Sequence, residues 1–213
     1  MRTLKCYTLA RCGRNNFPKD VKMFWYKATT KEILQARNSI FLHDIIPILK
    51  EKNFVSAPFK DAWFGYYAGL GYMYDMCRLR EGKFLELLTT TICRKDNYIQ
   101  IRIMAFELTP RLKSLSLLNN TAGLAYKVRP NNEKEMRLDT DFFERAPILS
   151  KKFWQEPCKL GHYFTKSGYL KQVEKLRRGV KAEIGKIDDY FKKWYLVHTP
   201  NLTHWDGRVI EKR

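Results

Sequence analysis

AWFGYYAGLGYMY, residues 62–74, is the stretch on which the fold depends. These thirteen residues carry no formal charge, so they could form part of a membrane span, a glycine loop that binds a phosphate, or a buried part of the core. A helix that crosses a bilayer needs about twenty apolar residues, so the stretch is too short for a transmembrane segment. Gly65 and Gly69 are spaced by four, which suits a helix that another backbone approaches closely. The spacing predicts a buried helix over residues 61–91. Its expected core side chains are Trp63, Tyr67, Leu70, Tyr74, Leu85 and Leu88.

The pair Gly69-x-Gly71 also resembles the start of a dinucleotide-binding loop. The third glycine of that pattern is replaced by Tyr74, and no strand is expected before the pair. The sequence therefore predicts no phosphate-binding loop here and no cofactor.

Residues 98–108, YIQIRIMAFEL, change the hydrophobic period from that of a helix to that of a strand. Apolar residues at every second position are typical of a β-strand. Two further apolar runs follow, LKSLSLL (112–118) and GLAYKV (123–128), each preceded by residues that favour a turn. We expect an antiparallel three-stranded meander over residues 98–129.

Helical periodicity appears on both sides of this region. A helix is expected to begin near Thr29 or Thr30, whose hydroxyls can cap free backbone amides, and Pro47 should bend or restart it. After Ser167, apolar residues recur at steps of three and four for about seven turns, which predicts a long amphipathic C-terminal helix. The fold class is therefore α+β, with helices flanking a small antiparallel meander. The apolar side of the long helix comprises Leu170, Val173, Leu176, Val180, Ile184, Ile187, Phe191 and Trp194.

The charge is strongly positive and unevenly distributed. The chain has 40 Lys and Arg against 22 Asp and Glu, a net charge of +18. Residues 1–60 hold 12 basic and 4 acidic groups, residues 61–150 hold 13 and 11, and residues 151–213 hold 15 and 7. Such an excess favours a polyanionic partner: nucleic acid, an anionic membrane surface or an acidic protein. We divide the chain into a basic aromatic arm (1–28), a helical and β-meander core (29–166), and a basic amphipathic helix with a C-terminal tail (167–213).

Two basic regions are the candidate nucleic-acid contacts. Cations on the exposed side of a helix neutralise phosphates, and aromatic rings among cations stack on unpaired bases. In the C-terminal helix the candidates are Lys171, Lys175, Arg177, Arg178, Lys181 and Lys186. In the N-terminal arm they are Arg2, Lys5, Arg11, Arg14, Lys19, Lys22, Trp25 and Tyr26.

Catalytic and metal-binding alternatives rest on weaker patterns. Cys158 and His162 lack the close second pair that structural zinc sites present, so no metal site is predicted. Two groups could in principle act chemically. Asp139, Asp141 and Glu144 could hold magnesium, although acids at a helix start are more often caps. His198 and His204 could exchange protons near neutral pH, but no nucleophile accompanies them. We predict no catalytic residues.

The cysteine content favours a reducing intracellular compartment, the cytoplasm or an organelle matrix, or a virus particle. Five cysteines form an odd set without regular spacing. The function expected from the sequence is that of a non-catalytic structural component of a large nucleic-acid-containing assembly. A ribonucleoprotein is the leading candidate for this assembly, and its protein subunits are expected as further partners. The alternatives are a viral connector or capsid-associated ring protein, a nucleic-acid-processing enzyme, and a membrane-peripheral subunit of a complex.

Overall fold

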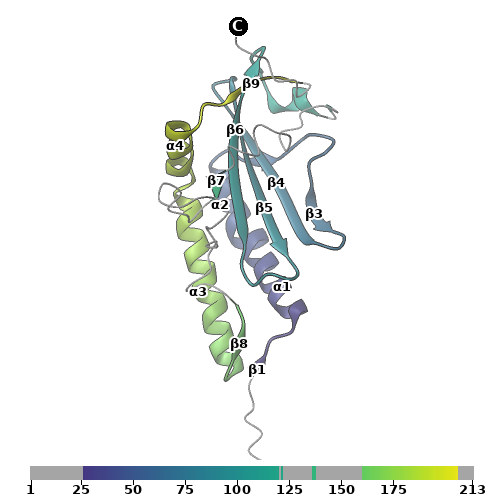
Figure 1. Ribbon diagram of the computed structural model, residues 1–213, viewed down its shortest axis with the longest axis vertical. Helices are drawn as coiled ribbons and strands as arrows, with labels where there is room; N and C mark the ends of the chain where they lie inside the picture. The colour runs from purple at the N-terminus through teal and green to yellow at the C-terminus, as the bar shows by residue number, and fades with distance from the viewer. Residues whose placement is uncertain (1–25, 120, 122–135, 138–159, 206–213) are drawn as a thin grey trace, which may run out of the picture.

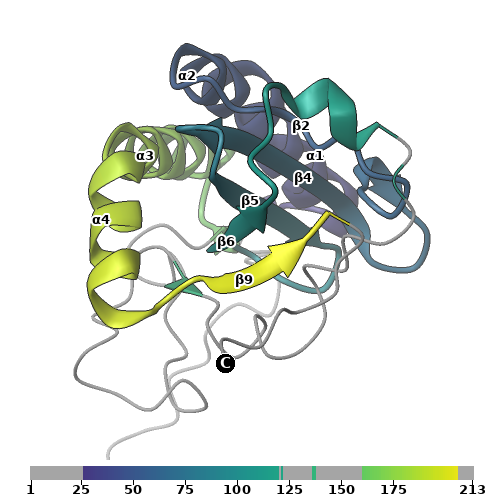
Figure 2. The same ribbon diagram turned by 90° about the horizontal axis from the view of Figure 1, so that it is seen from above.

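The structure is a computed structural model of the 213-residue chain, and it describes residues 26–119, 121, 136–137 and 160–205. Within these residues, helices and a mixed sheet form an α+β fold, as the sequence predicts (Figure 1). The helices α1 (Thr30–Ile40), α2 (Ile46–Glu51) and α3 (Lys166–Gly185) lie on the same side of the sheet, and α4 (Ile187–Val197) follows α3 (Figure 2). No helix among the described residues has the length and apolar character needed to span a bilayer.

The main sheet has seven strands in the described part of the chain. The central strands β4 (Gly71–Arg80), β5 (Phe84–Cys93) and β6 (Gln100–Thr109) pair antiparallel in that order. At one edge, β2 (Val55–Ser56) and β3 (Phe64–Tyr67) both pair antiparallel with β4. At the other edge, β6 pairs with β7 (Met136–Arg137) and, in parallel, with β9 (Asn201–His204). A separate two-stranded sheet joins β1 (Tyr26–Lys27) to β8 (His162–Tyr163).

The helix predicted over residues 61–91 is wrong, because this segment forms β3, β4 and most of β5. Glu81 and Gly82 both have positive φ, 56° and 66°, in the turn of the β4–β5 hairpin, where residues 81–83 connect the paired Arg80 and Phe84. Gly71 has φ 139°, and a Cβ there would lie 2.2 Å from the Ile92 carbonyl oxygen. The glycines therefore permit tight turns and close strand pairing rather than helix packing.

Burial within this segment follows the strands. Tyr74, Leu85 and Leu88 are buried, as expected, whereas Trp63 and Tyr67 are exposed. These two rings lie in or beside the edge strand β3, where no second layer covers them among the described residues.

The three-stranded meander is confirmed only in its first strand. Residues 100–109 form β6, but Leu115–Leu118 forms a short 3₁₀ helix instead of the second strand. Ser114 explains the difference, because its hydroxyl accepts a hydrogen bond from the Ser116 amide at 3.1 Å, a local bond that competes with strand pairing. The third predicted strand lies outside the described residues.

The long C-terminal helix is divided into two. α3 ends at Gly185, Lys186 leaves the helical conformation with φ −93° and ψ 14°, and α4 begins at Ile187. The apolar side nevertheless continues across the break, because the step from Ile184 to Ile187 keeps both side chains on the core. Periodicity alone therefore could not reveal the interruption. The prediction of the apolar side is wrong at Leu170, which is 55% exposed, and Val173 is only partly buried. The fully buried side chains are Leu176, Val180, Ile184, Ile187, Phe191 and Trp194.

The main hydrophobic core lies between the helices and one face of the sheet. It brings together side chains from α1, α3 and α4 with Met76, Leu88 and Ile103 of the central strands. A second cluster on the opposite face contains Cys77, Leu87 and other apolar side chains. The predicted division at residues 28 and 166 stays a prediction, and α3 and α4 complete the same core as α1.

The start of α1 is confirmed at the predicted threonine. Thr29 Oγ1 accepts a hydrogen bond from the Glu32 amide at 3.1 Å, and the Thr29 amide donates to the Glu32 carboxylate at 2.7 Å. This reciprocal pair satisfies two amides that the first turn would otherwise leave free. Pro47 stands in the first turn of α2, after a π-helical turn at Phe41–Ile45.

Removing this cap should have a modest effect on stability. We expect Thr29→Ala to lower the free energy of unfolding by about 1 kcal/mol, since one amide loses its acceptor. Thr29→Ser keeps the hydroxyl and should stay close to the wild-type value. Urea unfolding followed by circular dichroism measures both, and equal stabilities of the two variants would contradict the assignment.

Candidate nucleic-acid interface

The C-terminal basic region forms a row of cations on the solvent side of α3. Thr165 begins the helix by accepting a hydrogen bond from the Gly168 amide at 3.0 Å. Leu176, Val180 and Ile184 then pack on the core. Spacings of three and four place the following exposed residues on the opposite side, and we call them the cation stripe: Lys171, Lys175, Arg178 and Lys181.

Two carboxylates partly neutralise this side of α3. Glu174 lies 2.6 Å from Arg177 and 3.6 Å from Arg178, and Asp44 lies 3.0 Å from Arg177 and 3.9 Å from Lys181. Arg177 is thus engaged between α3 and the π-helical turn, where it positions the helix. Arg178 remains 76% exposed, and exposed ion pairs contribute little stability. Lys186 lies at the break after α3, paired with Glu183 at 3.1 Å.

Of the candidate residues in the N-terminal arm, only Tyr26 lies within the described residues. Arg2, Lys5, Arg11, Arg14, Lys19, Lys22 and Trp25 lie outside the described residues. Tyr26 is described, and it is held in place: its hydroxyl donates to Glu32 at 2.9 Å, which raises the pKa of Tyr26. Its ring packs against Tyr169 in α3 with centroids 5.4 Å apart. Residue 26 therefore joins α1 to the first turns of α3, next to the beginning of the cation stripe.

A second surface, which the helix prediction concealed, lies at the other edge of the sheet. A cavity of about 450 Å³ opens between α1 and the β3–β4 hairpin. We call it the aromatic cleft, and its lining residues are Thr30, Lys31, Leu34, Gln35, Tyr66, Tyr72 and Arg94. Figure 1 shows β3 and α3 at opposite sides of the molecule, so the aromatic cleft and the cation stripe are separate surfaces.

The loop that carries Arg94 is held by a buried arginine of α1. Arg37 in α1 donates to the Tyr98 carbonyl at 2.8 Å and to the Cys93 carbonyl at 3.0 Å, on either side of the loop that holds Arg94. Burial lowers the pKa of Arg37 to about 10, so the guanidinium is still charged at neutral pH. The cation thus ties the β5–β6 loop to α1, and with it the position of Arg94.

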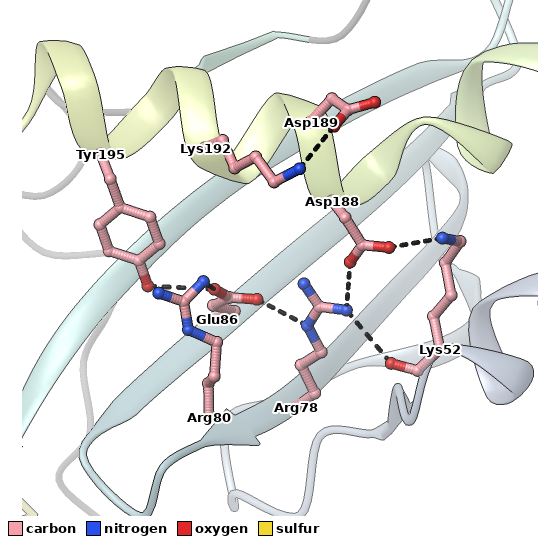
Figure 3. A network of polar contacts seen from close by, with 8 residues as sticks. All are labelled: Lys52, Arg78, Arg80, Glu86, Asp188, Asp189, Lys192 and Tyr195. Carbon is pink, nitrogen blue, oxygen red and sulfur yellow. Dashed lines mark hydrogen bonds and ion pairs between the residues drawn. The ribbon is translucent and has the colours of Figure 1, made fainter.

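A buried polar network lies at the opposite end of the helix layer, where α4 meets the sheet (Figure 3). Glu86 on β5 accepts hydrogen bonds from Arg78 Nε at 2.6 Å and from the Tyr195 hydroxyl at 3.1 Å, and Arg80 lies 3.4 Å away. Burial, with Glu86 beside it, raises the pKa of Tyr195. The network joins α4 to β4 and β5.

Asp188 extends this network to the end of α2. Its carboxylate pairs with Arg78 at 2.7 Å and with Lys52. Burial disfavours the charged form of Asp188, but the hydrogen bonds from Lys52 and Arg78 outweigh it, and the pKa of Asp188 is lowered. The Arg78 guanidinium also lies 4.6 Å from the centre of the Phe54 ring. The contacts of these residues assign them to holding α4 in place.

The remaining sequence candidates are scattered. His198 ends α4 beside Trp194, with ring centroids 5.2 Å apart, and His204 ends β9. Asp139, Asp141, Glu144 and Cys158 lie outside the described residues. Across the described ranges, no cluster of three or more His, Cys, Asp or Glu side chains could hold a metal ion.

Comparison of the chain with protein-family models, with curated proteins and with solved structures found no match.

Proposed function

We propose that this protein is a non-catalytic structural component of a large nucleic-acid-containing assembly, with a ribonucleoprotein as the leading candidate. It contacts phosphates through the cation stripe and the basic N-terminal arm. One observation supports this most directly: four cations follow one exposed side of α3, directly opposite the side packed on the core. A net charge of +18 adds the long-range attraction that such contacts need.

The geometry of the stripe suits a phosphate backbone. Its cations are carried by one rigid helix whose start is capped and whose apolar side is buried, so their spacing is held without a partner. Contacts of this kind are independent of base sequence and release counterions, so the affinity should fall steeply with salt. The viral, enzymatic and membrane-peripheral alternatives stay predictions, and no observation on the described residues favours one of them over the assembly component.

Removing the stripe should weaken binding in a salt-dependent way. The variant Lys171→Ala, Lys175→Ala, Arg178→Ala removes three cations that are exposed. We expect its affinity for a 20-base-pair duplex RNA in low salt to fall at least tenfold. The slope of log affinity against log salt should decrease by about one for each phosphate that is no longer neutralised. Fluorescence anisotropy with a labelled duplex measures both quantities.

A matched variant separates local binding from net charge. Lys60→Ala, Arg111→Ala, Lys113→Ala removes the same charge from exposed positions that lie outside α3 and the elements packed against it. This control should keep most of the affinity and the slope. Equal decreases in the two triple variants would show that only the overall charge matters, and wild-type affinity in the stripe variant would refute the proposed phosphate binding.

A further inference from the structure

Two of the residues that line the aromatic cleft, Tyr66 and Tyr72, are aromatic, and Tyr66 also belongs to a run of exposed rings at β3. Trp63, Phe64, Tyr66 and Tyr67 follow one another along the edge strand with 40 to 49% of their surface exposed. Contiguous exposed apolar surface of this kind usually marks a binding site. Tyr66 and Tyr72 face each other across the β3–β4 pair, with ring centroids 5.5 Å apart and planes at 76°.

These two tyrosines are held in position before any ligand arrives. The Tyr72 ring lies parallel to Tyr74, at an interplanar angle of 4°, and Tyr74 is itself buried against Phe41 with its hydroxyl hydrogen-bonded to Asn38 at 2.5 Å. The Tyr66 hydroxyl accepts a hydrogen bond from Arg94 at 2.7 Å. A wall that is already ordered loses little entropy on binding.

The cleft also holds positive charge. Lys31 and Arg94 line it from α1 and from the β5–β6 loop, and within the described residues neither forms an ion pair with a carboxylate. The opposite wall offers polar groups, the Gln35 amide and the Thr30 hydroxyl, next to the apolar Leu34. Rings, cations and a few hydrogen-bonding groups thus converge on one cavity of about 450 Å³, within the usual range of a few hundred cubic ångströms for ligand sites.

We infer that the aromatic cleft binds an unpaired nucleobase of a single-stranded nucleic acid, with the base stacked on one of the two rings, Tyr66 or Tyr72, and in edge contact with the other, and with its phosphate facing Arg94 and Lys31. Base–aromatic stacking combined with cations is how proteins hold single strands without reading their sequence. A base inside a duplex cannot reach such a ring. The inference deepens the proposed function, because it names unpaired nucleotides as the ligand, but it rests on a different surface from the cation stripe.

The test compares single-stranded and duplex ligands on the full-length chain. The probes are a labelled 12-nucleotide oligouridine and a labelled 12-base-pair RNA duplex, measured by anisotropy. For Tyr66→Ala with Tyr72→Ala, we expect the single-strand affinity to fall at least tenfold. The duplex affinity should stay within twofold, and the salt dependence should stay unchanged because no charge is removed. The matched control, Tyr66→Phe with Tyr72→Phe, keeps both rings and should stay within threefold of wild type.

Two further measurements distinguish a loss of base binding from a loss of folding. The single variant Tyr66→Ala removes a half-exposed ring and should keep the wild-type circular dichroism while its affinity for oligouridine falls several-fold. Ultraviolet crosslinking of the wild type to oligouridine, followed by mass spectrometry, should locate the crosslink within residues 66–72 or at Arg94.

Each alternative outcome decides the matter. Unchanged single-strand affinity in the alanine variants, or equal decreases for duplex and single strand, would overturn the cleft as a base-binding site while leaving the cation stripe untouched. A second copy of the chain that covers the cleft, seen as a dimer in analytical ultracentrifugation and absent in the alanine variants, would also overturn it. The stripe variant could bind the duplex with wild-type affinity while the tyrosine-to-alanine variants lose affinity for oligouridine. In that case the proposed phosphate binding by the stripe fails and the cleft stands as a base-binding site. If the wild type binds neither probe, both proposals fail.

Discussion

Glu86→Ala is expected to lower the free energy of unfolding by about 3 to 5 kcal/mol, the largest loss of any change considered for this molecule. The Glu86 side chain has no exposed surface and accepts hydrogen bonds from Arg78 and from the Tyr195 hydroxyl. Without it, the Arg78 guanidinium, only 13% exposed, keeps Asp188 as its remaining carboxylate. The Tyr195 hydroxyl loses its acceptor inside the protein, which adds a further desolvation cost. Arg80 is 43% exposed and can turn to water, so it contributes little to the loss.

Urea unfolding with linear extrapolation measures this change, and two variants define its origin. Glu86→Gln keeps the volume and one acceptor oxygen, so we expect a smaller loss than for alanine. Glu107→Ala removes a partly buried glutamate from the neighbouring strand, where it forms one ion pair with Lys83. Its expected cost is about 1 kcal/mol or less. If Glu86→Ala were as stable as Glu107→Ala, the network of Figure 3 would not hold α4 on the sheet.

Arg37→Met is expected to cost about 2 to 3 kcal/mol. Methionine fills much of the same volume but donates no hydrogen bond, so the Tyr98 carbonyl loses its charged donor and the Cys93 carbonyl loses one of two donors. Removing a buried charge recovers part of this cost, which keeps the net effect below that of Glu86→Ala. Because Arg37 ties down the loop that holds Arg94, the variant should also weaken oligouridine binding.

Amide hydrogen exchange locates the effect within the chain. Protection should decrease first in the β5–β6 loop, residues 94–99, before it decreases in β4 or α3. Arg177→Met provides the control, because that arginine is 38% exposed and its loss should cost less than about 1 kcal/mol. A uniform loss of protection across the sheet would contradict a local role for Arg37.

The sequence predicts the helices of this molecule better than its sheet. The α+β class, the cap at Thr29, the restart at Pro47 and the buried side of α3 and α4 all depend on local patterns, which side-chain spacing records directly. The break at Lys186 could not be predicted from such a pattern, because the spacing of the apolar residues continues across it. The strands between residues 61 and 91 could not be predicted either. Closely spaced glycines and aromatic residues are compatible both with a closely packed helix and with a β-hairpin.

A signal for the hairpins is nevertheless present. Phe64 and Tyr66 alternate on one strand, Tyr72 and Tyr74 alternate on the next, and Glu81-Gly82 fits a hairpin turn with positive φ. The same error conceals the aromatic cleft, because a helix over residues 61–91 does not bring Tyr66 and Tyr72 opposite each other as two paired strands do. The cation stripe, by contrast, could be predicted, because its residues are close in sequence and need only one helix to bring them together.

The parallel pairing of β9 with β6 has a consequence for biosynthesis. The ribosome delivers residues in order, so the Phe106–Thr109 half of β6 emerges long before Asn201–His204, its partner among the described residues. Until His204 has left the exit tunnel, that half of the strand presents open amides and carbonyls, which can pair with a neighbouring nascent chain. Completion of this edge of the sheet therefore waits for the synthesis of residues 201–204, and a pause after α4 would prolong the aggregation-prone interval.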